Sequence, residues 1–325
     1  MNENKVSSLK FRGFFSYFRE ITSFLFFLSV LLLVSSCGTL SKEQIKSVEK
    51  FSNACDSFNR YPSLLFAEVA RIRMERGLFY AASLSDPSNS IEELNSIYMA
   101  FEQDMKLASK CDISLKILKS YSNALEVLSS DERWKSRGVE FRSLGRAMDS
   151  LVIQTNKLHI FQEELPVGIA NSAAKIVAYG AQALLKRKQH RLICTFVGES
   201  DTLVQALVFG LVQTLRSPQV AIMLENEKTG LPLDYKSFLR SSTVVPFNSI
   251  EYDRKYLQLK ESCDKLTYSR GQIISAANRL AKAHKMVALS LHNKKRVGEV
   301  FEQLLQLIDS IEMVQKQFQV IIAAK

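Results

Sequence analysis

Four histidines are the side chains best suited to bind metal or transfer protons at neutral pH. They are His159, His190, His284 and His292. In di-iron enzymes built on helical bundles, a glutamate stands three residues before the ligating histidine, so that both side chains face the metal. Here that position holds Asn156, Arg187, Ala281 and Leu289. We therefore predict no metal site and no catalytic histidine.

The other polar motifs give no indication of catalysis. The sequence contains no G-x-S-x-G, G-x-x-x-x-G-K, G-x-G-x-x-G, H-E-x-x-H or C-x-x-C motif. Adjacent carboxylates occur as Glu92–Glu93 and Glu163–Glu164. The first pair falls in the first turn of a predicted helix, where the helix dipole favours negative charge. The second pair directly precedes a proline-initiated helix. We predict a non-catalytic protein without a cofactor.

The cysteines permit one disulfide that the predicted topology would allow. Apart from Cys37, the chain contains Cys55, Cys111, Cys194 and Cys263, which allow three pairings. In an up-down-up arrangement, Cys55 near the end of the first helix and Cys111 at the end of the third would share one pole. A Cys55–Cys111 bridge is therefore a candidate in an oxidising compartment. Free buried thiols are the alternative.

The longest apolar run lies near the N-terminus, from Phe24 to Val34. A membrane-spanning helix needs about 20 apolar residues, so this run is too short to span. Its length matches the apolar region of a secretory signal, about 7–15 residues. The basic residues that precede such a region are also present, as Lys5, Lys10, Arg12 and Arg19. We interpret the run as an export signal rather than a membrane span or a core helix.

The residues that follow the run have a recognisable order: a branched apolar residue, two small residues and a cysteine. They are Val34, Ser35, Ser36 and Cys37. This order resembles the lipobox of bacterial lipoproteins, and the resemblance covers about residues 1–37. It implies cleavage before Cys37 and attachment of diacylglycerol to the Cys37 thiol. An ordinary secretory signal with a chance cysteine is the alternative.

The resemblance also implies a domain organisation. Residues 1–36 would be the signal peptide and residues 37–40 a lipidated tether. The helical domain would cover 41–325, with a possible subdivision near residue 165 or 245. Two or three acyl chains at Cys37 would anchor the protein stably, because each buried CH₂ contributes about 0.8 kcal/mol.

A location follows from the residues after the lipobox. In lipoproteins of enteric-type bacteria, an aspartate after the lipidated cysteine retains the protein at the inner membrane, and position 38 is glycine. Acidic residues that direct some lipoproteins to the cell surface are absent before Glu43. We therefore expect the outer membrane, on its periplasmic face, with envelope proteins as partners and no nucleic acid. The oligomeric state stays open.

Composition and periodicity predict an elongated, mostly antiparallel all-α bundle with coiled-coil-like packing. The chain has 46% hydrophobic residues, enough for a core, and only 12 glycines and 6 prolines, too few for a turn-rich β fold. Capping boxes are expected at Ser41–Gln44, Ser90–Glu93 and Ser129–Glu132. The predicted helices cover about 41–59, 62–84, 90–108, 113–128, 129–164, 166–190, 201–215, 249–291 and 297–321, with short helical pieces in 219–242. Small residues make 166–190 the candidate for the most buried helix.

Two predicted helices carry apolar stripes with alternating gaps of three and four residues. The first stripe is formed by Ile91, Leu94, Tyr98, Phe101, Met105 and Ala108. The second is formed by Val297, Val300, Leu304, Leu307, Ile311, Val314, Phe318 and Ile321. The C-terminal stripe is either a coiled-coil surface for a partner or the seam of an intramolecular bundle. A further row (Phe301, Leu305, Ile308, Ile322) widens it and favours the intramolecular seam.

Basic residues are the remaining candidate site. One cluster is Lys186, Arg187, Lys188 and Arg191, and the other is Lys294, Lys295 and Arg296. Removing the four basic and two acidic residues of 1–36 lowers the net charge from +10 to +8. The clusters suit phosphate-rich ligands or membrane headgroups. The alternative is a cationic helix C-terminus together with a solvated loop.

Three functions remain compatible with these observations. We favour a lipid-anchored envelope protein that acts as a helical scaffold or interaction subunit. The alternatives are an envelope enzyme or small-ligand binder with an unfamiliar site, and a membrane-active protein whose apolar stretches 168–185 and 203–215 insert after rearrangement. The arginines Arg71, Arg73 and Arg76, set among Glu68 and Glu75, are interpreted as an internal lattice of ion pairs.

Overall fold

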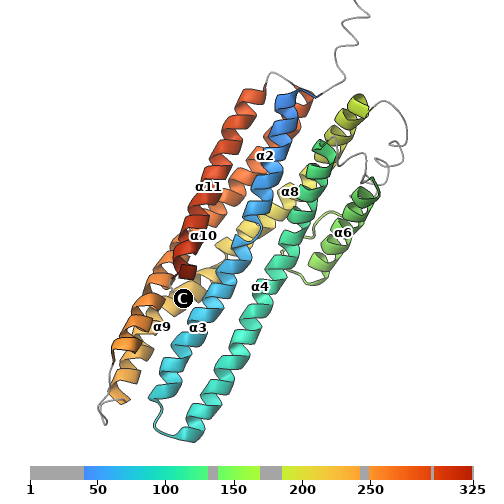
Figure 1. Cartoon of the computed structure of the whole chain (residues 1–325). Helices are drawn as coiled ribbons and strands as arrows, with labels where there is room; N and C mark the ends of the chain where they lie inside the picture. The colour runs from blue at the N-terminus through green and yellow to red at the C-terminus, as the bar shows by residue number, and fades with distance from the viewer. Residues whose placement is uncertain (1–39, 131–137, 169–184, 242–248, 294–295, 324–325) are drawn as a thin grey trace, which may run out of the picture.

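The computed structural model describes residues 40–130, 138–168, 185–241, 249–293 and 296–323 (Figure 1). These residues form long helices joined by short turns, and none of them forms a strand. The helices lie side by side in an elongated bundle. The predicted all-α bundle is therefore confirmed, whereas the export signal and the lipobox lie outside the described residues.

The first two helices follow one another along one side of the bundle. α2 spans Lys42–Phe58, and α3 spans Tyr61–Ser83. The predicted capping box is present: Ser41 Oγ accepts from the Gln44 amide at 3.2 Å, and Gln44 Oε1 accepts from the Ser41 amide at 2.8 Å. Figure 1 shows α2 and α3 running in the same direction, with no hairpin between them. The first part of the expected up-down-up order is therefore wrong.

A single long helix, α4 (Pro87–Ser129), replaces the two helices predicted at 90–108 and 113–128. The segment between those two ranges holds no glycine or proline, so nothing there interrupts the helical hydrogen bonds. The predicted start at Ser90 was also wrong. Asp86 caps the helix by accepting a hydrogen bond from a first-turn amide at 2.9 Å. At about 1.5 Å per residue, α4 is about 65 Å long and runs along most of the bundle (Figure 1).

α6 (Gly138–Lys157) lies beside the C-terminal part of α4 and is shorter than the helix predicted for 129–164. Ser129 is the last residue of α4, so it does not cap a new helix, and its expected partner Glu132 lies outside the described residues. At the other end the chain turns at His159, whose φ of 47° is left-handed and incompatible with a continuing helix.

α8 (Leu185–Arg216) is continuous through the break predicted between residues 190 and 201. The one helix-weakening residue in that stretch is Gly198, and glycine costs only about 1 kcal/mol in a helix interior. Most of the predicted 166–190 helix, residues 169–184, lies outside the described residues.

α9 (Pro218–Ser241) is one helix, so the prediction of short pieces in 219–242 was wrong. Pro232 lies inside α9. A proline in a helix interior costs about 3 kcal/mol. Burial of Leu231 and Tyr235 in the core offsets that cost, because a large buried apolar side chain contributes about 1.5–3 kcal/mol.

α10 (Ile250–His292) and α11 (Val297–Ala323) agree with the predicted 249–291 and 297–321 helices. The α11 stripe is almost fully buried from its second member onwards, at 3% exposure or less: Val300, Leu304, Leu307, Ile311, Val314, Phe318 and Ile321. α11 packs mainly on α10 and α2 of the same chain. The stripe is therefore an intramolecular seam, while Leu305 of the outer row stays 52% exposed.

Buried side chains from α2 to α11 form one continuous hydrophobic core. Its members lie on both sides of positions 165 and 245. The largest fully buried side chains include Phe51, Tyr121 and Phe196, with the Tyr121 and Phe196 rings stacked at 5.4 Å between centroids. These aromatic rings join α2, α4 and α8 in the interior of the bundle.

Candidate functional site

The ends of α2, α8, α10 and α11 meet at one end of the bundle, which we call the basic pole (Figure 1). Gln44 Nε2 of α2 donates to the Ser290 carbonyl of α10 at 2.6 Å. His190 Nε2 and Cys194 Sγ of α8 lie 3.4 Å and 3.9 Å from the Leu291 carbonyl. These contacts fix the starts of α2 and α8 against the end of α10.

Positive charge is concentrated at this pole. Residues 185–191 and 292–296 include seven lysines and arginines and no acidic residue. The exposed cationic side chains described at the pole include Lys42, Lys46, Arg191 and Arg296. The acidic residues next to them on α2 and α11 include Glu43, Glu49 and Glu299. At the opposite end of the bundle, exposed side chains of both charges occur, such as Asp86, Glu251 and Arg254.

The fold brings described members of both predicted basic clusters to this one pole. Lys186, Arg187 and Lys188 lie in the first turn of α8, and Arg296 lies just before the first turn of α11. Lys294 and Lys295 lie outside the described residues. The alternative explanation by a helix C-terminus does not apply to the α8 cluster, because a helix dipole disfavours positive charge at an N-terminus.

The described chain also enters the bundle at the basic pole. Leu40, the first described residue, is partly buried against the core. Ser41 then caps α2. The lipobox residues Val34, Ser35, Ser36 and Cys37 lie outside the described residues. A chain arriving from Cys37 therefore meets the bundle next to the basic side chains.

The candidate disulfide is not formed: Cys55 and Cys111 are both free and buried. The pairing assumed that α2 ends level with Cys111, but Cys111 lies within the long helix α4, and α2 continues into α3 along it. Burial raises the pKa of the Cys111 thiol to about 12 and that of the Cys194 thiol to about 11. These thiols are protonated at neutral pH and are poor nucleophiles.

A buried chain of hydrogen bonds links α4, α10 and α8. Tyr121 Oη lies 2.6 Å from His284 Nε2, and His284 Nδ1 lies 2.8 Å from Asp201 Oδ1. Tyr121 and His284 are fully buried, whereas the Asp201 side chain is 36% exposed. The hydrogen bond with His284 is the main cause that lowers the pKa of Asp201.

These three side chains could pass a proton along their hydrogen bonds, but a substrate could not reach the two that are buried. A general base must reach the proton that it removes within about 3 Å, or through one water. No surface of Tyr121 or His284 is open to a substrate. We interpret the chain as a polar cross-link between helices. Sequence analysis did not identify it, because its members are 163 and 83 residues apart and share no local motif.

The arginines of α3 form ion pairs as predicted, but within the predicted set only Arg71 and Glu68 pair with each other. Glu75 pairs with Lys255 of α10 instead. Arg71 pairs with Glu68, while Arg73 bridges Asp104 of α4 and Glu227 of α9 at 2.7 Å each. Arg76 also reaches Glu227, at 3.2 Å. Glu227 is 2% exposed, so its charge depends on these two arginines. The lattice holds α3, α4 and α9 together, and Arg73 and Arg76 also line a surface pocket of about 360 Å³ between these helices.

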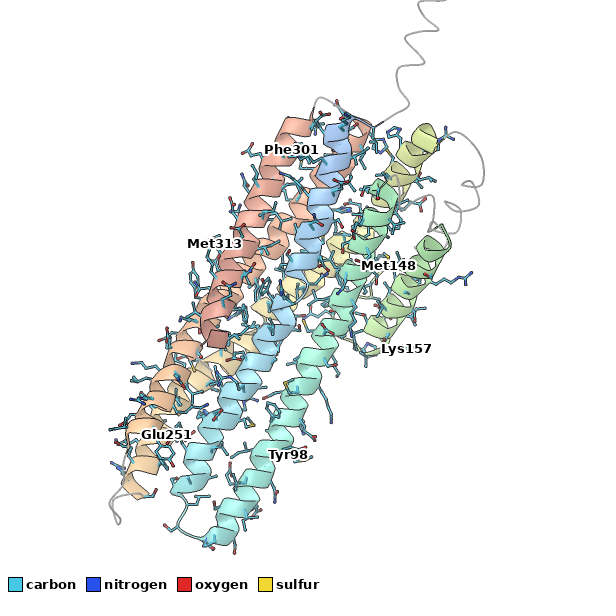
Figure 2. All side chains as sticks on the ribbon, viewed as in Figure 1. Tyr98, Met148, Lys157, Glu251, Phe301 and Met313 are labelled. Carbon is cyan, nitrogen blue, oxygen red and sulfur yellow. The ribbon has the colours of Figure 1, made fainter. Side chains whose placement is uncertain are left out.

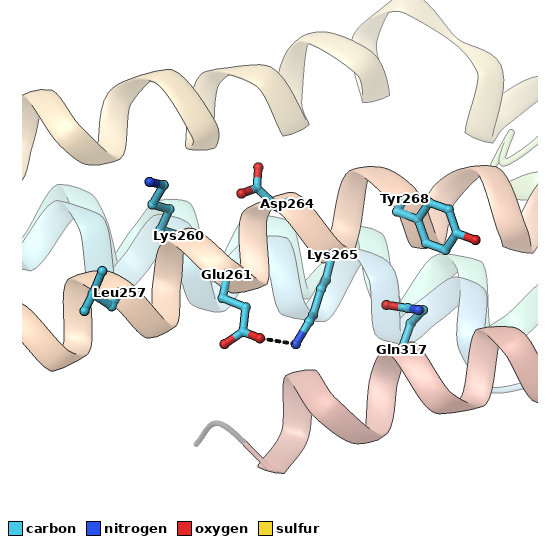
Figure 3. Close-up of a pocket in the computed structure, with 7 residues that line it drawn as sticks. All are labelled: Leu257, Lys260, Glu261, Asp264, Lys265, Tyr268 and Gln317. Carbon is cyan, nitrogen blue, oxygen red and sulfur yellow. Dashed lines mark hydrogen bonds and ion pairs between the residues drawn. The ribbon is translucent and has the colours of Figure 1, made fainter.

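One surface groove lies between α10 and the C-terminal part of α11 (Figure 3). Its volume is about 470 Å³. It is lined by Leu257, Lys260, Glu261, Asp264, Lys265, Tyr268 and Gln317. Glu261 and Lys265 pair with each other one helical turn apart. The groove is open to solvent, and its charged groups do not converge on one enclosed point as in small-molecule sites.

Among the described residues, no group of three or more His, Cys, Asp or Glu side chains is placed to hold a metal ion. One helical stretch, His190–Arg216 of α8, is long and apolar enough to cross a membrane by length and composition. Its apolar window is 56% buried inside the bundle, as in the core helix of a soluble protein.

The Tyr121–His284–Asp201 cross-link makes stability depend on pH. Because the pKa of Asp201 is lowered in the folded state, its carboxylate contributes stability at neutral pH that is lost as pH falls below about 4. We expect Asp201→Asn to lower the free energy of unfolding at pH 7 by about 1 kcal/mol and to flatten its decline at acidic pH. Urea unfolding at pH 7 and pH 3.5 checks this, with the exposed neighbour Glu199→Gln as control. An unchanged pH dependence in Asp201→Asn would contradict the role of the pair.

Comparison with known proteins adds no relative: no family model, no curated protein and no solved structure matches the chain. The function is therefore argued from the geometry of this molecule, and the basic pole is its most distinctive feature.

Proposed function

We propose that the chain is a lipid-anchored protein of the bacterial envelope, and that its bundle serves as a non-catalytic scaffold or interaction subunit. The observation that carries the proposal is the entry of the chain at the basic pole. Only three residue steps separate Leu40 from the proposed lipidated Cys37. A chain of that length spans at most about 11 Å. An anchor at Cys37 would thus hold the basic pole against the membrane surface.

Electrostatics supports that orientation. Charges interact strongly within a Debye length, about 8 Å at physiological ionic strength. Each lysine or arginine near an anionic membrane surface contributes about 1 kcal/mol. The pole and the tether act together, since the lipid keeps the basic side chains within reach of the headgroups. The alternating charges at the opposite end give that end no comparable attraction.

The length of the bundle suits a scaffold. With the basic pole at the membrane, the far end of the roughly 65 Å helix α4 would stand well away from the lipid. Surfaces along that length would be available to proteins in the envelope. The buried position of α8 does not favour the membrane-active alternative, because insertion would require opening the core.

Lipid attachment is tested by growing bacteria that produce the full chain with radiolabelled palmitate. We expect the wild-type chain to incorporate label and to sediment with membranes, because acylation at Cys37 supplies the anchor. Cys37→Ala should lose the label and the membrane retention. Cys194→Ala, a change at a half-buried cysteine of the bundle, should keep both. Label on Cys37→Ala, or none on the wild type, would contradict the proposal.

The basic pole is tested separately with a soluble chain that begins at Gly38 and with vesicles containing phosphatidylglycerol. We expect Arg191→Glu combined with Arg296→Glu to weaken vesicle binding about thirtyfold or more, at about 1 kcal/mol per basic residue removed. The matched pair Lys236→Glu and Arg254→Glu, exposed at the opposite end, should change binding by less than about twofold. Equal losses in the two pairs would show that only net charge matters.

A further inference from the structure

A polar pocket lies where α2 passes into α3. Figure 2 shows this junction about midway along the bundle, between Tyr98 and Phe301. The helix is interrupted here because Pro62, in the first turn of α3, has no backbone N–H to donate. The pocket has a volume of about 330 Å³ between the junction and α4. Its lining side chains include Asp56, Asn59 and Arg60 from the junction, and Leu115, Lys116 and Lys119 from α4.

Asn59 is a lining residue that is both polar and almost fully buried, at 8% exposure. Its Nδ2 and Oδ1 atoms are buried, and neither has a hydrogen-bond partner among the described residues. Burying an amide without a partner is destabilising. The backbone does not require asparagine, because its φ of −53° and ψ of −28° are right-handed helical values that other residues adopt. The unpaired amide therefore points to a group that is supplied from outside the chain.

The charged side chains of the pocket are only partly paired with one another. Lys116 pairs with Asp112 at 3.1 Å. Arg60, Lys119 and Asp56 are exposed, and none of them forms an ion pair with another described residue. These three groups comprise two cations and one anion, so they carry a net charge of +1. The unpaired part of the pocket thus favours a ligand with one negative charge.

We propose that the pocket binds a small anion that carries an amide beside its carboxylate, as an N-acyl amino acid does. The amide of such a ligand has one donor and one acceptor, which match Oδ1 and Nδ2 of Asn59. Its carboxylate accepts charge-assisted hydrogen bonds from Arg60 and Lys119. The volume lies at the lower end of the range for small-molecule sites, about 300–1,000 Å³.

Binding requires a small local rearrangement. The amide atoms of Asn59 are buried, so a ligand contacts them only after lining side chains have moved. The side chains of Arg60, Lys116 and Lys119 are exposed. Exposed side chains change rotamer within nanoseconds, so this movement does not limit access to the pocket.

Saturation-transfer NMR on the full chain in detergent micelles tests the choice of ligand, with N-acetyl-alanine as the probe. We expect saturable binding. Two matched compounds should each bind about tenfold more weakly, because each loses one set of hydrogen bonds. In 2-methyl-4-oxopentanoate a CH₂ replaces the amide N–H, and in N-acetyl-alanine amide a neutral group replaces the carboxylate. No saturable binding of the probe, or equal affinity for all three compounds, would overturn the proposal.

Substitutions test the location of the site. Asn59→Leu should weaken binding of N-acetyl-alanine about tenfold, and Lys119→Met should weaken it severalfold. The controls are Asn53→Leu on α2 and Lys110→Met on α4, both at exposed positions outside the pocket, and they should leave binding unchanged. Equal effects of the site and control substitutions would place the ligand elsewhere and overturn the proposal.

The melting temperature without ligand separates a binding role of Asn59 from a structural one. Asn59→Leu should keep or raise it, because the substitution removes an unpaired buried amide. A lower melting temperature with unchanged ligand binding would show that Asn59 supports the fold instead, and would contradict the proposal. None of these outcomes depends on Cys37, so they can be separated from the lipid-anchor test.

Discussion

The hydrogen bond between Tyr121 Oη and His284 Nε2 joins the two longest described helices, α4 and α10, in the interior of the bundle. Both side chains are fully buried, and leaving either unpaired would cost about 1–3 kcal/mol. His284 also lies against Phe51 of α2, at 5.4 Å between ring centroids. The end of α10 is thereby set beside the start of α2, and the basic pole depends on that placement.

The helical class, the Ser41 cap and the extents of α10 and α11 could be predicted because each depends on local sequence. Capping and hydrophobic periodicity depend on residues close together in the sequence. In these segments the structure has the helices that those local patterns predict. The break expected within α4 was wrong because no glycine or proline interrupts the helix there. The breaks expected within α8 and α9 were wrong for a shared reason. Gly198 and Pro232 weaken a helix by a few kcal/mol at most, and tertiary burial of their neighbours exceeds that cost.

The stripes on α4 and α11 show that periodicity alone does not predict whether an apolar face is buried. Both have gaps of three and four residues, yet the α11 stripe is buried and much of the α4 stripe is exposed. Periodicity identifies an apolar face but does not say which element covers it. For α11 the cover is α10 and α2 of the same chain. In the first half of α4, no described helix covers Ile91, Leu94, Tyr98 or Met105.

For a similar reason, only part of the candidate site could be predicted from the sequence. The two basic clusters could be recognised separately, but about 100 residues separate Lys188 from Lys294. Whether the two clusters lie close together depends on how α8 and α10 pack. The approach of Leu40 to the same pole also follows from packing. In the proposed function, a lipid tether and a basic surface at the same end would together orient the bundle at a membrane, which neither feature would do alone.

The most direct test of this account is the distance of each end of the bundle from the lipid. The lipidated chain would be reconstituted in vesicles with an energy-transfer acceptor at the membrane surface, and with a donor at position 292 or position 89. The account predicts efficient transfer from position 292 at the basic pole. Transfer from position 89 should be much weaker, since that end of α4 lies about 65 Å from its other end. Equal transfer from the two positions would mean that the bundle lies flat, and would contradict the proposed orientation.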